Sequence, residues 1–116
     1  MSTGPIERPA LNSIYATAAD KPWVEAYPGV EIKTIYEDPA QHLHVSLMRY
    51  RPGAFVPRHR HTAVEHIYVL EGAVEDEDGV CTAGNYALRL PGCVHSPGSR
   101  NGALSLAIAY GPTEPV

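Results

Sequence analysis

The chain has 116 residues, a length that suits one domain rather than two of ordinary size. Hydrophobic residues make up 44% and charged residues 19%, which is typical of a globular chain and not of a disordered one. The net charge of −4 argues against a nucleic-acid backbone as partner, and no apolar stretch is long enough to span a bilayer. The N-terminus lacks the apolar core of a secretory signal. We therefore expect a cytoplasmic protein without nucleic-acid or membrane partners.

Chain-breaking residues are frequent, with ten glycines and eleven prolines, which leaves little room for long helices. The two cysteines, Cys81 and Cys93, are too few for a disulfide scaffold, and we expect free thiols. We expect residues 1–21 to form an N-terminal arm that packs on the edge of the domain or on a partner subunit. A short helical turn is an option within residues 11–19. Residues 22–116 should form the single domain.

From residue 22 onward, short segments with a period of two alternate with turn residues, which is the pattern of strands. The Asp78-Gly79 pair is a strong hairpin signal, because these residue types suit the positive φ angles of a type I′ turn. No segment predicts a convincing helix, so the fold class should be all-β, a sandwich or a barrel. The predicted strands cover residues 23–27, 30–36, 43–50, 55–56, 66–70, 73–77, 80–82, 86–90 and 104–110.

The informative segment for chemistry is rich in histidine. His59 and His61 are two residues apart, so they face the same side of a strand, and Glu65 keeps that parity if the chain stays extended or crosses a short turn. Ile67 and Val69 should then point inward with Glu65. His95, on a later segment, is a candidate fourth ligand. Neutral imidazoles with one carboxylate suit one divalent ion, Fe(II), Zn(II), Mn(II), Ni(II) or Cu(II), better than calcium or magnesium.

This segment resembles the first cupin motif, a glycine followed at fixed intervals by His-x-His, glutamate and a second glycine. The matching residues are Gly53, His59, His61, Glu65 and Gly72. The second cupin motif is matched by Gly84, Gly92 and His95, with Leu90 where the family has proline and Ser99 where it has asparagine. The resemblance implies a single-domain cupin β-barrel of the jelly-roll type, a double-stranded β-helix. It also implies His59, His61, Glu65 and His95 as metal ligands.

Within the cupins, the chain is similar to the ChrR type. The similar segments are 27–30, 58–61, 69–72, the hairpin at 76–79, and 90–97. That group includes zinc-binding domains of anti-sigma factors and small enzymes similar to acetylacetone dioxygenase, which use Fe(II) and oxygen to cleave a carbon–carbon bond beside a carbonyl. No helical sigma-binding domain fits in the twenty residues before the predicted barrel.

Three functions stay open at this point. The first is an Fe(II)-type dioxygenase that cleaves a carbon–carbon bond in a β-dicarbonyl or similar carbonyl substrate. The second is a non-catalytic domain that binds a metal or small ligand and signals through a partner. The third is a Zn- or Mn-dependent lyase or isomerase acting on a small acid or sugar acid. Fe(II) and Zn(II) are the favoured metals, and zinc would exclude oxygen activation because it has no redox chemistry.

Several other residues have two interpretations each. Tyr68 and Arg89 are candidates for contacts just outside the metal ligands, but Tyr68 alternates away from Glu65 and can equally lie on the outer face. Arg89, like Arg49, can grip a carboxylate or remain solvated. Cys93 can approach the metal or simply fill a loop, and His44 can face the barrel interior. The bulky residues on both faces of the 66–70 strand predict a homodimer.

Overall fold

The structure is a computed structural model, and it describes residues 12–116. Its elements are twelve strands and two short 3-10 turns, so the all-β prediction is confirmed. The turns are η1 (Ala18–Asp20) and η2 (Pro39–Gln41). The strands are β1 (Val24–Tyr27), β2 (Val30–Asp38), β3 (Leu43–Tyr50), β4 (Ala54–Phe55), β5 (His59–His61), β6 (Glu65–Asp76), β7 (Gly79–Thr82), β8 (Tyr86–Arg89), β9 (Val94–His95), β10 (Gly98–Ser99), β11 (Ala103–Ala109) and β12 (Thr113–Pro115).

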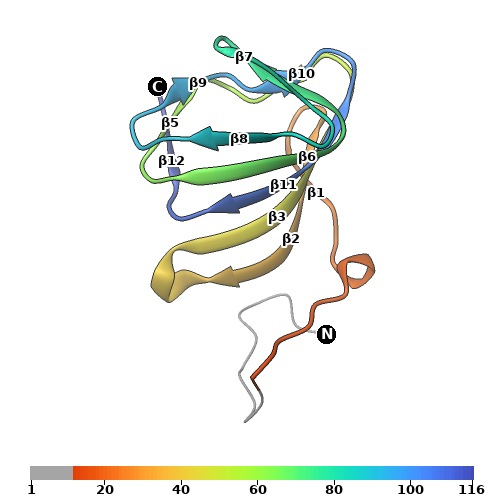
Figure 1. Ribbon diagram of the computed structural model, residues 1–116, viewed down its shortest axis with the longest axis vertical. Helices are drawn as coiled ribbons and strands as arrows, with labels where there is room; N and C mark the ends of the chain where they lie inside the picture. Colours follow the sequence, from red (N-terminus) through yellow and green to blue (C-terminus); the bar gives the residue numbers. More distant parts are fainter. Residues whose placement is uncertain (1–11) are drawn as a thin grey trace.

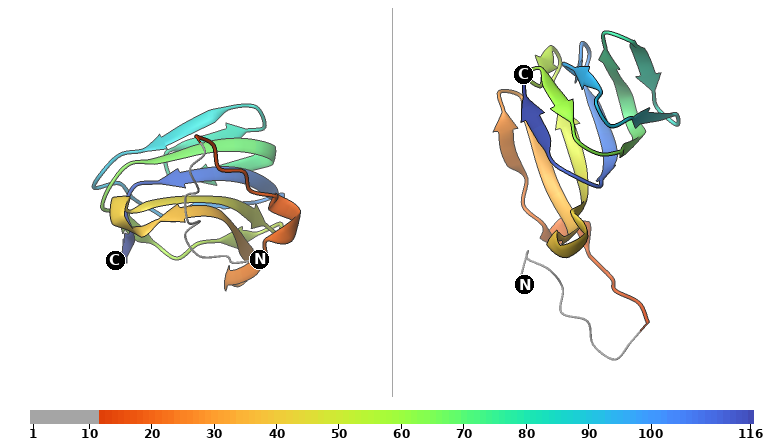
Figure 2. Two further views of the ribbon diagram at one scale, coloured as in Figure 1. Left: turned by 90° about the horizontal axis from the view of Figure 1, so that it is seen from below. Right: turned by 90° about the vertical axis from the view of Figure 1, so that its left-hand side faces the viewer.

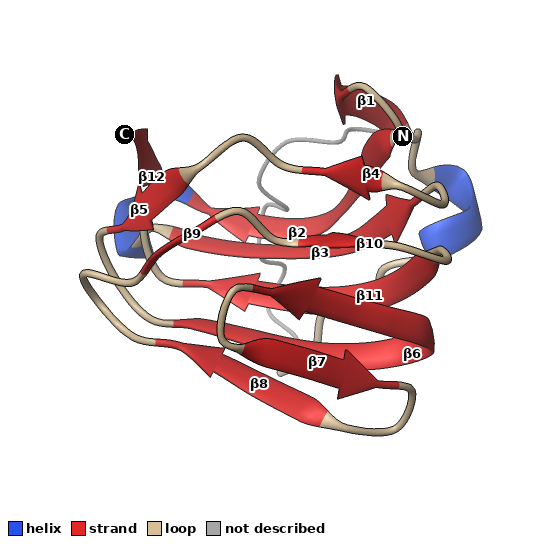
Figure 3. Cartoon of the chain, turned by 90° about the horizontal axis from the view of Figure 1, so that it is seen from above, coloured by secondary structure: helices blue, strands red, loops and turns tan. Residues whose placement is uncertain are grey.

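The strands form two antiparallel sheets. The larger sheet has the order β1-β2-β3-β11-β6-β10-β4, with β7 and β8 also paired to β6, and the smaller sheet has the order β12-β5-β9. In Figure 1 the strands β2, β3, β11, β6 and β8 lie one above another, and β7, β9 and β10 lie at the top. Figure 3 shows the same curled arrangement from above, with β5, β9 and β12 at one end. The small sheet therefore closes one end of a curled large sheet.

Strand β6 differs from the prediction, which divided this region into two strands at Gly72. It is one strand of 12 residues, whose first half pairs with β8 and β11 and whose second half pairs with β7 and β10. The pairing with β11 skips Leu70, which forms a bulge. Gly72 follows with a φ of +70°, and a Cβ there would lie 2.1 Å from the carbonyl oxygen of Gly102. The bulge and the glycine together let one strand bend around the barrel corner.

The core lies on the inner face of the curled large sheet. Its inner residues alternate along the strands as predicted for Ile67 and Val69, which are 5% and 0% exposed. On β11 the inward residues are small, and the larger Leu104, Leu106 and Ile108 lie half-buried on the other face. The buried apolar core comprises Val30, Tyr50, Ala54, Val56, Ile67, Val69, Val74, Ala103 and Ala107. Small side chains on β11 leave space inside the barrel.

The segment before β1 contacts β2 through η1, and the division of the chain into an arm at 1–21 and a barrel domain at 22–116 stays a prediction. Figure 2 shows this segment running away from the barrel. The Lys33 ammonium on β2 donates to the carbonyl oxygen of Ala18 in η1 at 2.9 Å. Residues 1–11 of the predicted arm, and the start of its predicted helical turn, lie outside the described residues. No helix within residues 12–116 has the length and apolar character needed to cross a bilayer.

The outer face of the large sheet carries large apolar side chains. Tyr68, Leu70, Tyr86 and Leu88 are between 43% and 55% exposed. Tyr68 and Tyr86 are cross-strand partners on β6 and β8. This surface agrees with the bulky outer face expected for the 66–70 strand, and the homodimer inferred from it stays a prediction.

Candidate metal centre

Three of the predicted ligands meet at one point. His59 and His61 lie on β5 and His95 lies on β9, and the antiparallel pairing of these strands places His59 directly opposite His95. The Nε2 atom of His61 lies 3.1 Å from that of His59 and 2.9 Å from that of His95. The candidate ligand atoms of the three residues all lie within 4.8 Å of one another. The structure thus brings together His59, His61 and His95.

The other nitrogen of each imidazole faces an oxygen atom. His59 Nδ1 is 2.9 Å from the carbonyl oxygen of Pro57, and His95 Nδ1 is 2.7 Å from Asp76 Oδ2. His61 Nδ1 is 4.0 Å from Glu65 Oε1, which is too long for a hydrogen bond. Because a neutral imidazole carries one proton, a hydrogen bond donated at Nδ1 leaves the Nε2 lone pair free. His59 and His95 therefore turn lone pairs toward their common centre.

The residues fit a divalent cation. Lone pairs converging at these distances repel one another unless a cation or a proton lies between them, and neutral imidazole nitrogens are ordinary ligands for transition metals. The pKa of His61 is lowered to about 4, first by burial and then by the neighbouring His95, His59 and Arg89. Burial also lowers the pKa of His95, against the opposing effect of its hydrogen bond to Asp76. Both imidazoles are therefore neutral at physiological pH, the state that binds metal.

Asp76 supports the centre from the neighbouring sheet. Its Oδ2 atom accepts a hydrogen bond from His95 and forms an ion pair with Arg89 Nη1 at 3.1 Å, while its Oδ1 atom accepts from the backbone N–H of Asp78 in the hairpin turn. Burial alone would raise the pKa of Asp76, but these hydrogen bonds and the charge of Arg89 outweigh it and lower the pKa. Asp76 is therefore an ionised acceptor that holds the ring of His95 in one orientation.

Glu65 lies outside the cluster of three imidazoles but lines the same cavity as His59 and His95, and its place as a fourth ligand stays a prediction. The chain bends between β5 and β6, so Glu65 belongs to the large sheet whereas the histidines belong to the small one. Glu65 nevertheless faces the same cavity as His59 and His95, as the predicted parity requires, and Ile67 is buried next to it along β6. The pKa of Glu65 is raised to about 7 by burial, although Arg89 acts in the opposite direction.

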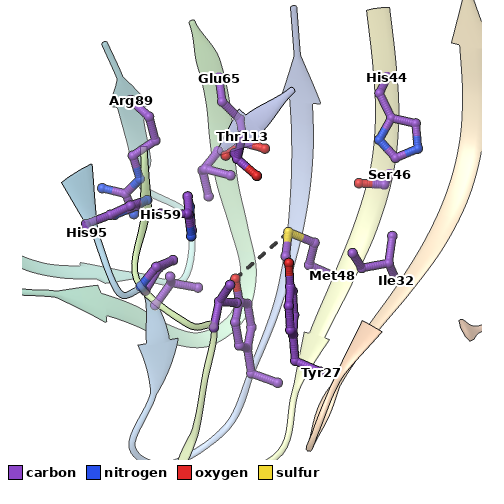
Figure 4. Close-up of a pocket in the computed structure, with 15 residues that line it drawn as sticks. Tyr27, Ile32, His44, Ser46, Met48, His59, Glu65, Arg89, His95 and Thr113 are labelled. Atoms are coloured by element: carbon purple, nitrogen blue, oxygen red, sulfur yellow. Dashed lines mark hydrogen bonds between the residues drawn. The ribbon is translucent and has the colours of Figure 1, made fainter. Parts of the chain in front are cut away.

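A small cavity adjoins the histidines. Its volume is about 140 Å³, and its walls combine apolar residues such as Ile32, Met48 and Ile67 with a few polar ones. Figure 4 shows His59, His95 and Arg89 on one side, His44 and Ser46 on the other, and Glu65 between them. Arg89 is 12% exposed. A ligand that binds the histidine cluster would thus occupy a space with apolar walls and polar ends.

The other candidate residues have different positions. Tyr68 follows the inward-facing Ile67 on β6, so its side chain points to the outer face, where it is 45% exposed. It is therefore not among the residues that line the cavity. Arg49 pairs with Glu31 at 3.1 Å on the surface. Cys93 is half-buried and outside the histidine cluster, and burial raises the pKa of its thiol. Ser99 is fully buried, and its hydroxyl donates to the Ala73 carbonyl at 2.6 Å.

Sequence reasoning missed the role of Asp76 and left the position of His44 open. In the sequence, Asp76 belongs to the acidic segment that leads into the Asp78-Gly79 hairpin signal, and nothing distinguishes it from the other acidic residues at 75–78. His42 and His44 also have the His-x-His spacing, which is the sequence signal that could have pointed to His44. The structure separates the two, because His42 lies in the exposed turn after η2 with a φ of +56° and His44 borders the cavity.

Comparison with known proteins identifies the family. The profile of the ChrR Cupin-like domain matches residues 11–114, nearly the whole chain. The chain belongs to the ChrR cupin-like family. Its cupin β-barrel fold is shown as well, because a cupin from Ralstonia eutropha superposes with a TM-score of 0.81 at 23% identity, over 90% of this chain and 72% of that one. No curated protein matches this cupin.

Two further solved structures are similar to this cupin. An acetylacetone dioxygenase from Acinetobacter johnsonii superposes with a TM-score of 0.76 at 14% identity, over 97% of this chain and 83% of that one. The anti-sigma factor ChrR of Rhodobacter sphaeroides, solved in complex with SigE, superposes with a TM-score of 0.69 at 25% identity. That match covers 78% of this chain and 50% of ChrR, so this cupin matches about half of the anti-sigma factor.

Proposed function

We propose that this cupin is an Fe(II)-dependent dioxygenase that cleaves a carbon–carbon bond in a small β-dicarbonyl compound. The observation that carries the proposal is the convergence of three imidazole Nε2 atoms, two of them fixed by hydrogen bonds at Nδ1, at the side of a small and largely apolar cavity. The fold likeness to an acetylacetone dioxygenase supports it. The overall reaction balances when both atoms of one oxygen molecule end up in the two carbonyl products, a carboxylic acid and a 2-oxoaldehyde in the case of pentane-2,4-dione.

The three imidazoles would hold the ion through their Nε2 atoms, which lie 3.1 Å apart for His59 and His61 and 2.9 Å apart for His61 and His95. Three protein ligands would leave coordination positions for substrate and oxygen, as at other non-haem iron sites. Bound Fe(II) would supply the redox chemistry that Zn(II) lacks.

The chain's own residues would bind and orient the substrate. Met48, Ile32 and Ile67 offer apolar surface to its carbon skeleton and limit the space for water. Arg89 lies half-buried on the histidine side of the cavity, where its charge would favour an anionic enolate over the neutral diketone. Glu65 lies in the same cavity with a pKa of about 7, so its carboxylate can take up a proton near neutral pH.

The test is oxygen uptake by protein loaded with Fe(II) under anaerobic conditions and then given a panel of β-dicarbonyl compounds in aerated buffer. We expect uptake that depends on the dicarbonyl, with none from the Zn(II)-loaded protein or from iron-treated His95→Ala. Metal content by mass spectrometry shows whether iron is bound. Bound iron without uptake on any member of the panel would contradict the proposal.

The second candidate is a non-catalytic domain that binds metal or a small ligand. The 25% identity to ChrR, whose solved complex contains SigE, favours this candidate. It predicts that ligands raise the melting temperature of the metal-loaded protein while no oxygen is consumed. Oxygen uptake that depends on a dicarbonyl compound would show that the domain is catalytic and would exclude this candidate.

A further inference from the structure

The cavity wall opposite the three histidines is polar. His44 and Ser46 lie on β3, both border the cavity, and Figure 4 shows them across the space from His59, His95 and Arg89. Ser46 is 3% exposed, so its hydroxyl belongs to the interior. A β-dicarbonyl compound with two plain alkyl ends has no group to pair with these two side chains. The polarity of this wall therefore bears on the identity of the substrate.

His44 is held in place by a neighbouring strand. Its Nε2 atom lies 3.0 Å from the hydroxyl oxygen of Thr34 on β2, and within residues 12–116 its Nδ1 atom has no hydrogen-bond partner. Thr34 is not itself a wall of the cavity. The hydrogen bond from behind restricts the ring and leaves the second nitrogen for another partner. His44 is thus oriented to form a hydrogen bond through Nδ1 with a ligand in the cavity. Ser46, two residues away on the same strand, offers a second polar group.

The size of the cavity links this wall to the histidine cluster. Its volume of about 140 Å³ is close to that of an engineered protein cavity of about 150 Å³ that holds benzene. A compound with a few more atoms than benzene and bound to the histidines would therefore fill the space and reach the far wall. Its distal group would lie beside His44 and Ser46.

The charges nearby favour a neutral distal group. Glu65 lines the cavity, and both Glu65 and Glu37 line the adjoining cleft that also contains His44. Arg89 is on the histidine side and is already paired with Asp76. A carboxylate at the far end would face acidic neighbours without a free cation from the described lining residues, whereas a hydroxyl can donate and accept hydrogen bonds.

We propose that the substrate is a small β-dicarbonyl compound with a neutral hydroxyl group at the end distant from the three histidines, and that His44 and Ser46 recognise this group. The inference rests on the proposed function, which it narrows from alkyl diketones to hydroxylated ones. A hydroxyl that pairs with built-in partners distinguishes such a substrate from an apolar analogue of the same shape, because the analogue leaves those partners unpaired.

Two ligands of equal size test the proposal, namely 1-hydroxypentane-2,4-dione and hexane-2,4-dione, which differ by a hydroxyl in place of a methyl group. Isothermal titration calorimetry on the Zn(II)-loaded protein measures both dissociation constants without oxygen chemistry. We expect the hydroxylated ligand to bind about tenfold more tightly, as one net hydrogen bond allows. The ratio of the two dissociation constants is then compared between variants. This comparison cancels the intrinsic difference between the two ligands in how strongly they chelate the metal.

The preference should disappear in His44→Phe and weaken in Ser46→Ala. His66→Phe is the matched control, because His66 lies on the outer face and bonds to Tyr86, so it should keep the full preference. Should His44→Phe fail to fold, Ser46→Ala carries the test. Equal binding of the two ligands by the wild type, or a preference that survives in both cavity variants, would overturn the inference alone. Binding of neither dione, together with absent oxygen uptake by the iron form, would overturn the proposed function as well.

Discussion

His95 and Asp76 come from different sheets and meet at 2.7 Å between Nδ1 and Oδ2. Both side chains are 3% exposed. This contact joins the strand that carries a predicted metal ligand to the end of β6, and it sets which nitrogen of His95 carries the proton. A carboxylate in this position also makes the imidazole a stronger electron donor.

Removal of this carboxylate should weaken metal binding. We expect Asp76→Ala to lower metal affinity about 10- to 100-fold, with Asp76→Asn in between because its amide oxygen can still accept from His95. Chelator competition on the purified variants measures the dissociation constants. Asp78→Asn is the control, since Asp78 is exposed in the same hairpin and contributes its backbone to Asp76. Equal affinities in Asp76→Ala and the control would refute the role of Asp76.

In the metal-free protein, His61 and Glu65 should change the free energy of unfolding in opposite directions as the pH changes. His61 has a lower pKa folded than unfolded, so the unfolded chain binds more protons between about pH 4 and 6.5 and stability falls on acidification. Glu65 has a raised pKa, so the folded chain binds more protons between about pH 4.5 and 7 and stability falls as pH rises. Each shift corresponds to about 3 kcal/mol at most. Because the lowered pKa of His95 acts in the same direction as that of His61, Glu65 should offset only part of the loss of stability on acidification in the wild type.

Glu65→Gln should make the pH dependence of stability that is due to His61 directly measurable. Without the ionisable carboxyl, the free energy of unfolding of the metal-free variant should fall as pH is lowered from 6.5 to 4.5, more steeply than in the wild type. Urea unfolding at several pH values, with chelator present, measures this. Parallel pH profiles for variant and wild type would show that Glu65 does not titrate as the structure indicates.

Two buried serines should respond oppositely to alanine substitution. Ser105 Oγ has no hydrogen-bond partner within the described part of the chain, whereas Ser99 Oγ donates to the carbonyl of Ala73. Ser105→Ala should therefore keep or raise the free energy of unfolding, and Ser99→Ala should lower it by about 1 kcal/mol. Thermal and urea unfolding check the pair. A larger loss in Ser105→Ala than in Ser99→Ala would contradict the prediction.

Gly72 should tolerate substitution much less than Gly84. Both have positive φ angles, of +70° and +83°, so alanine at either position costs about 1–2 kcal/mol of backbone strain. At Gly72 a Cβ would also collide with the backbone of Gly102, whereas at Gly84 nothing lies within 4 Å. Gly72→Ala should therefore lower stability more. Similar melting temperatures for the two variants would show that the backbone at the bulge rearranges at little cost in stability.

The strands and the pair His59 and His61 could be predicted from local spacing, whereas His95 was predicted through the resemblance to the second cupin motif. The His-x-His pair and the period-two segments carry their geometry within a few residues. The side-chain direction of Asp76 depends instead on the bulge at Leu70, because Glu65 and Asp76 are an odd number of residues apart and a regular strand would send them to opposite faces. The distance between Glu65 and the three imidazoles depends on the bend between β5 and β6, whose shape no residue type in it dictates. The short strands β5, β9, β10 and β12 likewise form through distant pairing.

The three histidines share one small sheet, which consists of β5 with three residues, β9 with two and β12 with three. So few backbone hydrogen bonds give this ribbon little stability of its own, whereas the large sheet has its own extensive pairing and core. An ion held by the histidines would tie β5 to β9 and leave the rest of the barrel unaffected. Amide exchange should therefore slow in these strands when metal is added and stay the same in β3, β6 and β11, so that metal loss loosens one end of the barrel without unfolding it.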